Sequence, residues 1–309
     1  MLVFKISNHL KNLAEESIAI RKQFIPSSKE DYGCEYTVDD PLLEEAYSPT
    51  RGLVHKYANR VLILLTFQCE SYCRFCTRRR TVSDIKRGQL TDSDIGNMRS
   101  YIKAHPEIKE VIFSGGDPLT VPPLLDKAMK QITSLPQIKI VRIGTRLPVS
   151  NPQKINQKIL NILKQVKQPL YILIHFEHPD EITQETIGAC ADLRKIGSML
   201  FSQSVFLKGV NDNYKTLYDL FTRLVEIGVK PYYVYHCDPT IGVGHFIVDF
   251  AREVEIMTKL RKNLSGLAFP VHVVDVPGGS GKVPAPLNFW QHGDINKCSD
   301  FLDNKKKII

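Results

Sequence analysis

The chain has 309 residues, of which 43% are hydrophobic and 24% charged, a composition typical of a globular protein with one large core. No apolar run approaches the length of a membrane span, and residues 1–24 lack the apolar core of a signal peptide, so we expect a cytoplasmic protein without membrane contact. The net charge of +8 is not accompanied by a basic helix or interleaved aromatic residues, which argues against nucleic-acid binding.

Most of the chain alternates between two kinds of segment. Apolar runs rich in β-branched and aromatic residues predict strands, and segments of helical periodicity separate them. Strands joined by helices of this length form parallel βαβ units, whose carboxyl ends share one ligand-binding face. Six such units predict an α/β barrel, complete or partial. The predicted strands are 60–67, 111–116, 138–145, 170–176, 199–207 and 231–238, followed by a last β-like run at 269–276.

Three regions follow from this pattern. Residues 1–50 do not alternate and predict one helix plus an extended lead-in, residues 51–290 form the core domain, and residues 291–309 form a short polar tail. Within the core domain, Thr91 and Asp94 have the spacing of a capping box ahead of a helix.

Three of the seven cysteines lie close together, at Cys69, Cys73 and Cys76, in the loop predicted to follow the first strand. In a chain without an export signal, such clustering favours a metal centre over disulfides. Zinc would need a fourth ligand, and only scattered His and Cys residues could supply one, so a zinc site stays as the alternative. A 4Fe-4S cluster held by three cysteines leaves one iron open to a small molecule.

The sequence around these cysteines resembles a known family. CESYCRFC (69–76) has the Cys-x3-Cys-x2-Cys signature of the radical S-adenosylmethionine (SAM) superfamily. Together with CTRRR, FSGGDPL, QSVFLKGVND, PYYVYHCD and VDVPGGSGK, it resembles the lysine 2,3-aminomutase family from about Gly52 to Pro284. The resemblance implies a radical SAM partial (β/α)6 TIM-like barrel with an N-terminal helical extension. It also implies three cofactors: a 4Fe-4S cluster, SAM and pyridoxal 5'-phosphate (PLP).

The resemblance assigns residues to the cluster and to SAM. The three clustered cysteines match the cluster ligands, and Phe75 matches the residue whose ring packs near the adenine. Gly115 and Gly116 match the motif whose missing side chains let the backbone approach the methionyl group of SAM. Asp117 is expected to hold this loop rather than to contact SAM. Candidates for the SAM ribose and carboxylate, for which a structural role is equally open, are His175 and Arg146.

The resemblance also assigns a PLP site, which falls in the core domain. Lys282 of PGGSGK matches the lysine that binds PLP through a Schiff base and gives it up when the substrate arrives. Gln203, Lys56, Tyr57 and Arg60 match positions around PLP, and the basic side chains among them suit its phosphate.

Three charged residues are expected to select the substrate. Arg78 matches the residue that binds the α-carboxylate, and Asp238 and Asp275 match the two aspartates that receive the distal ammonium of lysine. Two carboxylates facing one ammonium penalise glutamate. The implied reaction converts L-lysine to β-lysine through hydrogen abstraction by a deoxyadenosyl radical and a 1,2-amino migration. The alternatives are arginine and lysine destined for elongation factor P.

The resemblance implies a reducing electron donor such as flavodoxin or ferredoxin, and a homo-oligomer stays open. Asn213 stands where the family carries a cysteine for a structural zinc, so we expect no such zinc. Glu177 and His236 depart from the usual asparagine and glutamine, and His236 is expected to be buried and hydrogen-bonded. A zinc-stabilised nucleic-acid-binding module is the non-enzymatic alternative.

Overall fold

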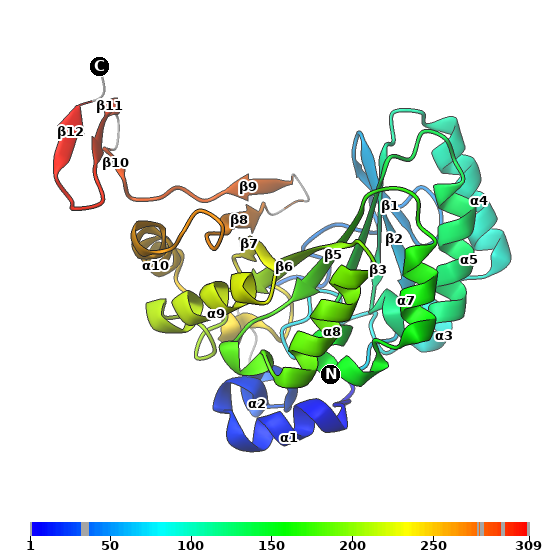
Figure 1. Ribbon diagram of the computed structural model, residues 1–309, viewed down its shortest axis with the longest axis horizontal. Coiled ribbons are helices and arrows are strands. Elements are labelled where there is room, and N and C mark those ends of the chain that lie inside the picture. The colour runs from blue at the N-terminus through cyan, green and yellow to red at the C-terminus, as the bar shows by residue number, and fades with distance from the viewer. Residues whose placement is uncertain (1, 32–36, 277, 279–280, 292–293, 308–309) are drawn as a thin grey trace.

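A nine-stranded sheet curls into an open half-barrel in the computed structural model, which describes residues 2–31, 37–276, 278, 281–291 and 294–307 (Figure 1). The strands follow one another in sequence order, the central seven run parallel, and the two edge strands are antiparallel to their neighbours. The strands are β1 (Leu53–Tyr57), β2 (Arg60–Thr66), β3 (Glu110–Gly115), β4 (Ile140–Thr145), β5 (Leu170–His175), β6 (Met199–Val205), β7 (Lys230–Tyr235), β8 (Val271–Asp275) and β9 (Lys282–Pro284).

Helices cover the outer side of the sheet, one or two after each parallel strand from β2 to β7 (Figure 1). Six βα units followed by β8 confirm the predicted partial α/β barrel. The Thr91–Asp94 capping box is also confirmed, at the start of α4. The helices are α3 (Ile85–Gly88), α4 (Asp92–Ala104), α5 (Pro122–Thr133), α6 (Leu147–Ser150), α7 (Gln157–Lys164), α8 (Gln184–Lys195), α9 (Tyr214–Glu226) and α10 (Phe250–Asn263).

The alternation of side chains along the strands separates the core from the hollow of the half-barrel. In β3, Val111 and Phe113 are buried in the hydrophobic core, whereas Ile112 and Ser114 point the other way and line a cavity. Successive side chains of a strand point to opposite faces, so the same period applies to β2 and β4. Residues needed for function therefore gather on the inner face, and the helices pack on the outer one.

The N-terminal region contains two helices, so the prediction of a single helix was wrong. Ser17 ends α1 (Asn8–Glu16) and caps α2 (Ile18–Phe24) by accepting a hydrogen bond from the backbone N–H of Ile20. A serine hydroxyl satisfies the free N–H groups of a helix start, so two short helices replace one long one. A 3-10 turn at Ser28–Asp31 follows.

The N-terminal region is fastened to the cysteine loop by a buried ion pair. The guanidinium of Arg74, with 1% of its side chain exposed, binds the carboxylate of Glu30, with 2% exposed, at 2.5 Å. Arg74 also donates hydrogen bonds to the backbone carbonyls of Leu2 and Val3, and Arg79 binds the same Glu30 carboxylate at 2.7 Å. Residues 2–31 thus pack against the loop that carries the cysteines.

The C-terminal region, expected to be a polar tail, forms three short antiparallel strands in the described residues. They are β10 (Trp290–Gln291), β11 (Asp294–Ser299) and β12 (Lys305–Lys307). This small sheet projects away from the half-barrel (Figure 1). Among the described residues, no helix is long and apolar enough to cross a membrane.

We predict that Glu30→Ala lowers the free energy of unfolding by about 3 kcal/mol, because it leaves the buried Arg74 guanidinium without its counter-ion. Urea titration followed by circular dichroism measures the change. Glu16→Ala removes an exposed acid from the same region and should change the free energy by no more than about 0.5 kcal/mol. Equal effects of the two substitutions would contradict the proposed anchor.

Candidate active site

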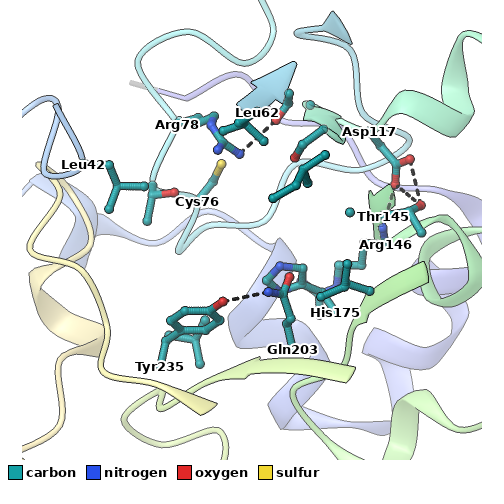
Figure 2. A pocket seen from close by; sticks show the side chains of 18 of the residues that line it. Leu42, Leu62, Cys76, Arg78, Asp117, Thr145, Arg146, His175, Gln203 and Tyr235 are labelled. Carbon is teal, nitrogen blue, oxygen red and sulfur yellow. Dashed lines mark hydrogen bonds between the residues drawn. The ribbon is translucent and has the colours of Figure 1, made fainter. Parts of the chain in front are cut away.

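A cavity of about 520 Å³ opens inside the half-barrel, at the carboxyl ends of the parallel strands. Its walls come from the cysteine loop, from the inner faces of the strands, and from the loops that follow them. Figure 2 shows Arg78 and Cys76 across the cavity from Gln203 and Tyr235. The cavity is lined by every residue predicted for the site: Lys56, Tyr57, Arg60, Cys69, Cys73, Phe75, Cys76, Arg78, Gly115, Gly116, Arg146, His175, Gln203, Asp238, Asp275 and Lys282.

The three clustered cysteines form one wall of the cavity. Burial raises the pKa of all three thiols, that of Cys76 to about 11, while Arg146 donates a hydrogen bond to the sulfur of Cys73 at 2.8 Å. Among the described residues, no three His, Cys, Asp or Glu side chains converge as ligands of a single metal ion. An iron–sulfur cluster distributes its thiolates over different irons, so this donor set fits a cluster better than zinc.

The glycine pair at the end of β3 is required by close contacts with the protein's own backbone. Gly115 has a φ of +118°, and a Cβ atom there would lie 2.3 Å from the carbonyl oxygen of Thr66. A Cβ on Gly116 would lie 2.3 Å from the carbonyl oxygen of Gln68. The loop thus packs directly against the end of β2, just before the first clustered cysteine. The glycines bring the two loops together, and so they shape the cavity before any ligand enters.

Asp117 holds this loop, as expected. Its buried carboxylate accepts hydrogen bonds from the hydroxyl of Thr145 at 2.8 Å, from the backbone N–H of Arg146 at 2.7 Å, and from that of Leu119 at 3.1 Å (Figure 2). Burial raises the pKa of Asp117, and these hydrogen bonds oppose the rise. The carboxylate joins the ends of β3 and β4, and its hydrogen bonds to other groups of the protein give it a structural role.

Arg146 is committed to contacts within the protein. Its guanidinium donates to Glu181 at 2.9 Å, to Gln23 at 2.5 Å and to the sulfur of Cys73. Only its Nε atom is buried without a partner among the described residues. Of the two roles open to Arg146, the contacts favour the structural one, since the guanidinium links α2, the cysteine loop and the turn before α8. His175 stays on the cavity wall, 3.4 Å from Glu177.

The residues predicted around PLP surround one part of the cavity. The Tyr57 hydroxyl is buried without a hydrogen-bond partner in the described part of the chain, and the guanidinium of Arg60 lies 3.7 Å from the centre of its ring. Gln203 donates to the hydroxyl of Tyr235 at 2.7 Å (Figure 2). The unpartnered hydroxyl beside basic side chains fits an absent anionic group such as a phosphate.

Lys282 lies at the start of β9, beside the two aspartates. Its ammonium binds the carboxylate of Asp275 at 2.5 Å and lies 5.1 Å from the centre of the Tyr235 ring. Burial and the nearby charge of Asp275 raise the pKa of Asp238 to about 7. Of the glycine-rich segment before Lys282, Pro277, Gly279 and Ser280 lie outside the described residues. An ammonium group therefore already sits where two carboxylates meet.

Arg78 also has a partner, which the sequence analysis missed. The carboxylate of Glu44 accepts from Nε of Arg78 at 2.8 Å and from Nη2 at 2.5 Å, and Nη1 of Arg78 donates to the carbonyl of Gly115 at 3.3 Å. Burial disfavours the charged guanidinium, but the charge of Glu44 raises the pKa of Arg78. The acidic run DDPLLEE, upstream of the basic run CTRRR, is the signal that could have indicated this pairing.

Glu177, His236 and Asn213, which depart from the family pattern, lie outside the cavity wall. Glu177 is fully buried and accepts from the backbone N–H of Val205 at 2.6 Å. His236 lies 3.0 Å from both carboxylate oxygens of Glu253, which confirms the expected hydrogen bond, but 21% of its side chain is exposed, so it is only partly buried. Asn213 caps α9. None of the three lines the cavity.

Comparisons with known proteins agree with this architecture. Residues 63–221 match the model of the radical SAM superfamily. A radical SAM methyltransferase from Sphaerobacter thermophilus superimposes with a TM-score of 0.51 and 16% sequence identity, over 72% of this chain and 68% of that one. At this identity the likeness shows the fold alone, and it confirms the predicted radical SAM partial barrel.

The curated relatives have aminomutase names. The chain is 41% identical to the L-lysine 2,3-aminomutase of Acetoanaerobium sticklandii, over 94% of this chain and 69% of that protein. It is 42% identical to that of Clostridium subterminale, over 87% and 65%. It is 37% identical to the glutamate 2,3-aminomutase of Clostridioides difficile, over 85% and 61%. The chain thus spans 61–69% of the length of these relatives.

The superfamily match covers the cysteine loop and the glycine pair, and the matches to the aminomutases extend over most of the chain. The chain therefore belongs to the lysine 2,3-aminomutase family of the radical SAM superfamily, and this membership implies a 4Fe-4S cluster, SAM and PLP as its cofactors.

Proposed function

We propose that the protein is a lysine 2,3-aminomutase, which converts L-lysine into β-lysine by moving the amino group from C2 to C3. The charge pattern of the cavity carries the proposal. The guanidinium of Arg78 comes from the loop after β2, and the carboxylates of Asp238 and Asp275 come from the ends of β7 and β8. One cation and two anions on the wall of one cavity suit an amino acid with a carboxylate and a distal ammonium.

The charges already present in the cavity support this choice. The chain's own Glu44 carboxylate lies on Arg78, and its own Lys282 ammonium lies on Asp275. Arg78 thus already binds a carboxylate, and Asp275 already binds an ammonium, which are the two groups of lysine that we assign to them. A glutamate side chain would instead confront Asp238 and Asp275 with a third carboxylate, which costs several kcal/mol in a buried site, on the order of a like-charge contact at an interface.

Three parts of the chain would hold the cofactors. Cys69, Cys73 and Cys76 would ligate the cluster, with the backbone at Gly115 and Gly116 and the ring of Phe75 beside SAM. Lys282 would bind PLP, and Tyr57, Lys56 and Arg60 would receive its phosphate, with Gln203 alongside. When bound, these groups supply a carbon radical and a carrier for the migrating nitrogen. The protein's own part is to orient the substrate between Arg78 and the two aspartates and to exclude water.

The proposal predicts which amino acid reacts. After anaerobic reconstitution with iron, sulfide, PLP and a reductant, the enzyme should convert lysine to β-lysine in the presence of SAM, and leave glutamate and arginine unchanged. Arginine carries a cation, but its planar guanidinium needs a wider site than a compact ammonium. Mass spectrometry of the products checks this. Conversion of glutamate or arginine in preference to lysine would overturn the substrate assignment.

We predict that Lys282→Ala abolishes covalent attachment of PLP, because Lys282 is the lysine that lines the cavity beside Tyr235 and Asp275. Borohydride reduction followed by peptide mass spectrometry should find PLP on Lys282 in the parent protein and on no lysine in the variant. Lys208→Ala removes an exposed lysine after β6 and should leave the modified peptide intact. Labelling of another lysine in the parent protein would refute the assignment.

The pH should control lysine binding through Asp238. With a pKa of about 7, this carboxyl is neutral below pH 7 and gains its charge above it, so the apparent KM for lysine should fall as pH rises from 6 to 8. Asp238→Asn cannot ionise, so KM should be higher, by roughly thirtyfold for about 2 kcal/mol, and should lose this pH dependence. Titration of the amino groups of lysine affects both proteins equally, so it cancels in the ratio of the KM of the variant to the KM of the parent. An unchanged pH profile in the variant would exclude Asp238.

A further inference from the structure

A short segment of the N-terminal region crosses the mouth of the cavity. We call residues 38–47 the strap. At one end, the backbone N–H of Val38 donates to the carbonyl of Pro239 at 2.8 Å, in the loop after β7. At the other end, the carbonyl of Tyr47 accepts from the backbone N–H of His55 in β1 at 2.9 Å. The strap therefore links the two sides of the half-barrel over the opening between them.

Acidic side chains of the strap bind the basic run that follows the cysteines. Asp40 binds Arg80 at 2.9 Å, and Glu45 binds Arg80 at 2.6 Å and Arg87 at 3.4 Å. These pairs are partly or largely exposed, so each contributes little by itself. They fix the strap over the cavity without sealing it.

One acid of the strap points inward. Glu44 lines the cavity, and 12% of its side chain is exposed. Its carboxylate occupies the Nε and Nη2 side of the Arg78 guanidinium, the planar fork that binds a carboxylate with two hydrogen bonds. The remaining Nη1 atom of Arg78 is engaged by the carbonyl of Gly115. No free two-pronged face of Arg78 is left for a second carboxylate.

We infer that Glu44 takes the place of the substrate's α-carboxylate on Arg78, and that lysine must displace Glu44 from Arg78 in order to bind. This inference rests on the proposed function, because it assigns the α-carboxylate to Arg78. Two carboxylates on one partly buried guanidinium would repel each other, so only one of them stays. The strap then acts as a gate that opens when the carboxylate of the substrate replaces Glu44 on Arg78.

Competition of this kind weakens substrate binding by a defined factor. Lysine binds only the fraction of the protein in which Arg78 is released, so the apparent dissociation constant rises as that fraction falls. If the paired form makes up about nine-tenths of the unliganded protein, removing the Glu44 charge should tighten lysine binding about tenfold. Ligands without a carboxylate do not compete with Glu44, so removing its charge should not tighten their binding.

The test compares two ligands on three proteins. Isothermal titration calorimetry is run on enzyme that carries its cluster and PLP, without SAM, so that no turnover occurs. The ligands are lysine and 1,5-diaminopentane, which is lysine without its carboxylate. The proteins are the parent, Glu44→Gln and Glu45→Gln. Glu45 is the matched control, because it lies next to Glu44 on the strap but binds Arg80 and Arg87 instead of Arg78.

The expected result is that Glu44→Gln binds lysine about tenfold more tightly and 1,5-diaminopentane no more tightly, while Glu45→Gln matches the parent for both ligands. Lysine binding that is unchanged or weaker in Glu44→Gln would overturn the inference, since Glu44 would then orient Arg78 and not compete for it. If Glu44→Gln does not fold, Glu44→Asp keeps the charge with a shorter reach and should tighten lysine binding by a smaller factor.

Failure of the proposed function gives a different pattern. If the parent protein forms β-lysine but lysine binds Glu44→Gln no better than the parent, the inference fails and the function stands. If lysine binds Glu44→Gln more tightly but no protein forms β-lysine, the competition at Arg78 stands and the proposed reaction fails.

Discussion

Charge compensation between buried groups is the constraint on which this structure depends. Charged groups taken out of water need partners, because burial penalises an unpaired charge heavily. Arg74 and Glu30 satisfy this need permanently and fasten the N-terminal region to the cysteine loop. Arg78 and Asp275 satisfy it through Glu44 and Lys282, whose side chains give up these partners in the functions that we propose. In the proposed function, a ligand with the same charges replaces these internal partners.

The parallel sheet brings these groups together from distant parts of the sequence. Each βα unit returns the chain to the same edge of the sheet. The loops after β2, β3, β7 and β8 therefore meet, although Thr66 at the end of β2 and Asp275 at the end of β8 are about two hundred residues apart in the sequence. The inner faces of β3, β4, β5 and β6 contribute alternate residues to the same cavity. Contact between the glycine pair and the end of β2 then fixes the spacing of the first two loops.

The parallel strands and the site residues were predictable because they depend on local patterns and on long motifs. Strand alternation identified β2 to β8, and every residue assigned to the site lines the cavity. The edge strands β1 and β9 escaped prediction because they are antiparallel additions outside the strand–helix alternation, and the second N-terminal helix because one serine, Ser17, divides a continuous helical pattern. The pairing of Glu44 with Arg78 escaped because it joins segments with no shared periodicity, and only their opposite charges connect them.

The two aspartates also depend on a buried group behind the cavity. Glu253 of α10 is fully buried, and its carboxylate lies 3.0 Å from ring nitrogens of His236, just after β7, and of His272, near the start of β8. This carboxylate ties the end of β7 to β8, and Asp238 and Asp275 follow the two histidines by two and three residues. Burial lowers the pKa of His236, but Glu253 raises it by a larger combined effect, and a charged His236 favours the ionised form of Asp238. The histidine that departs from the family pattern thus supports the carboxylate that we assign to the substrate.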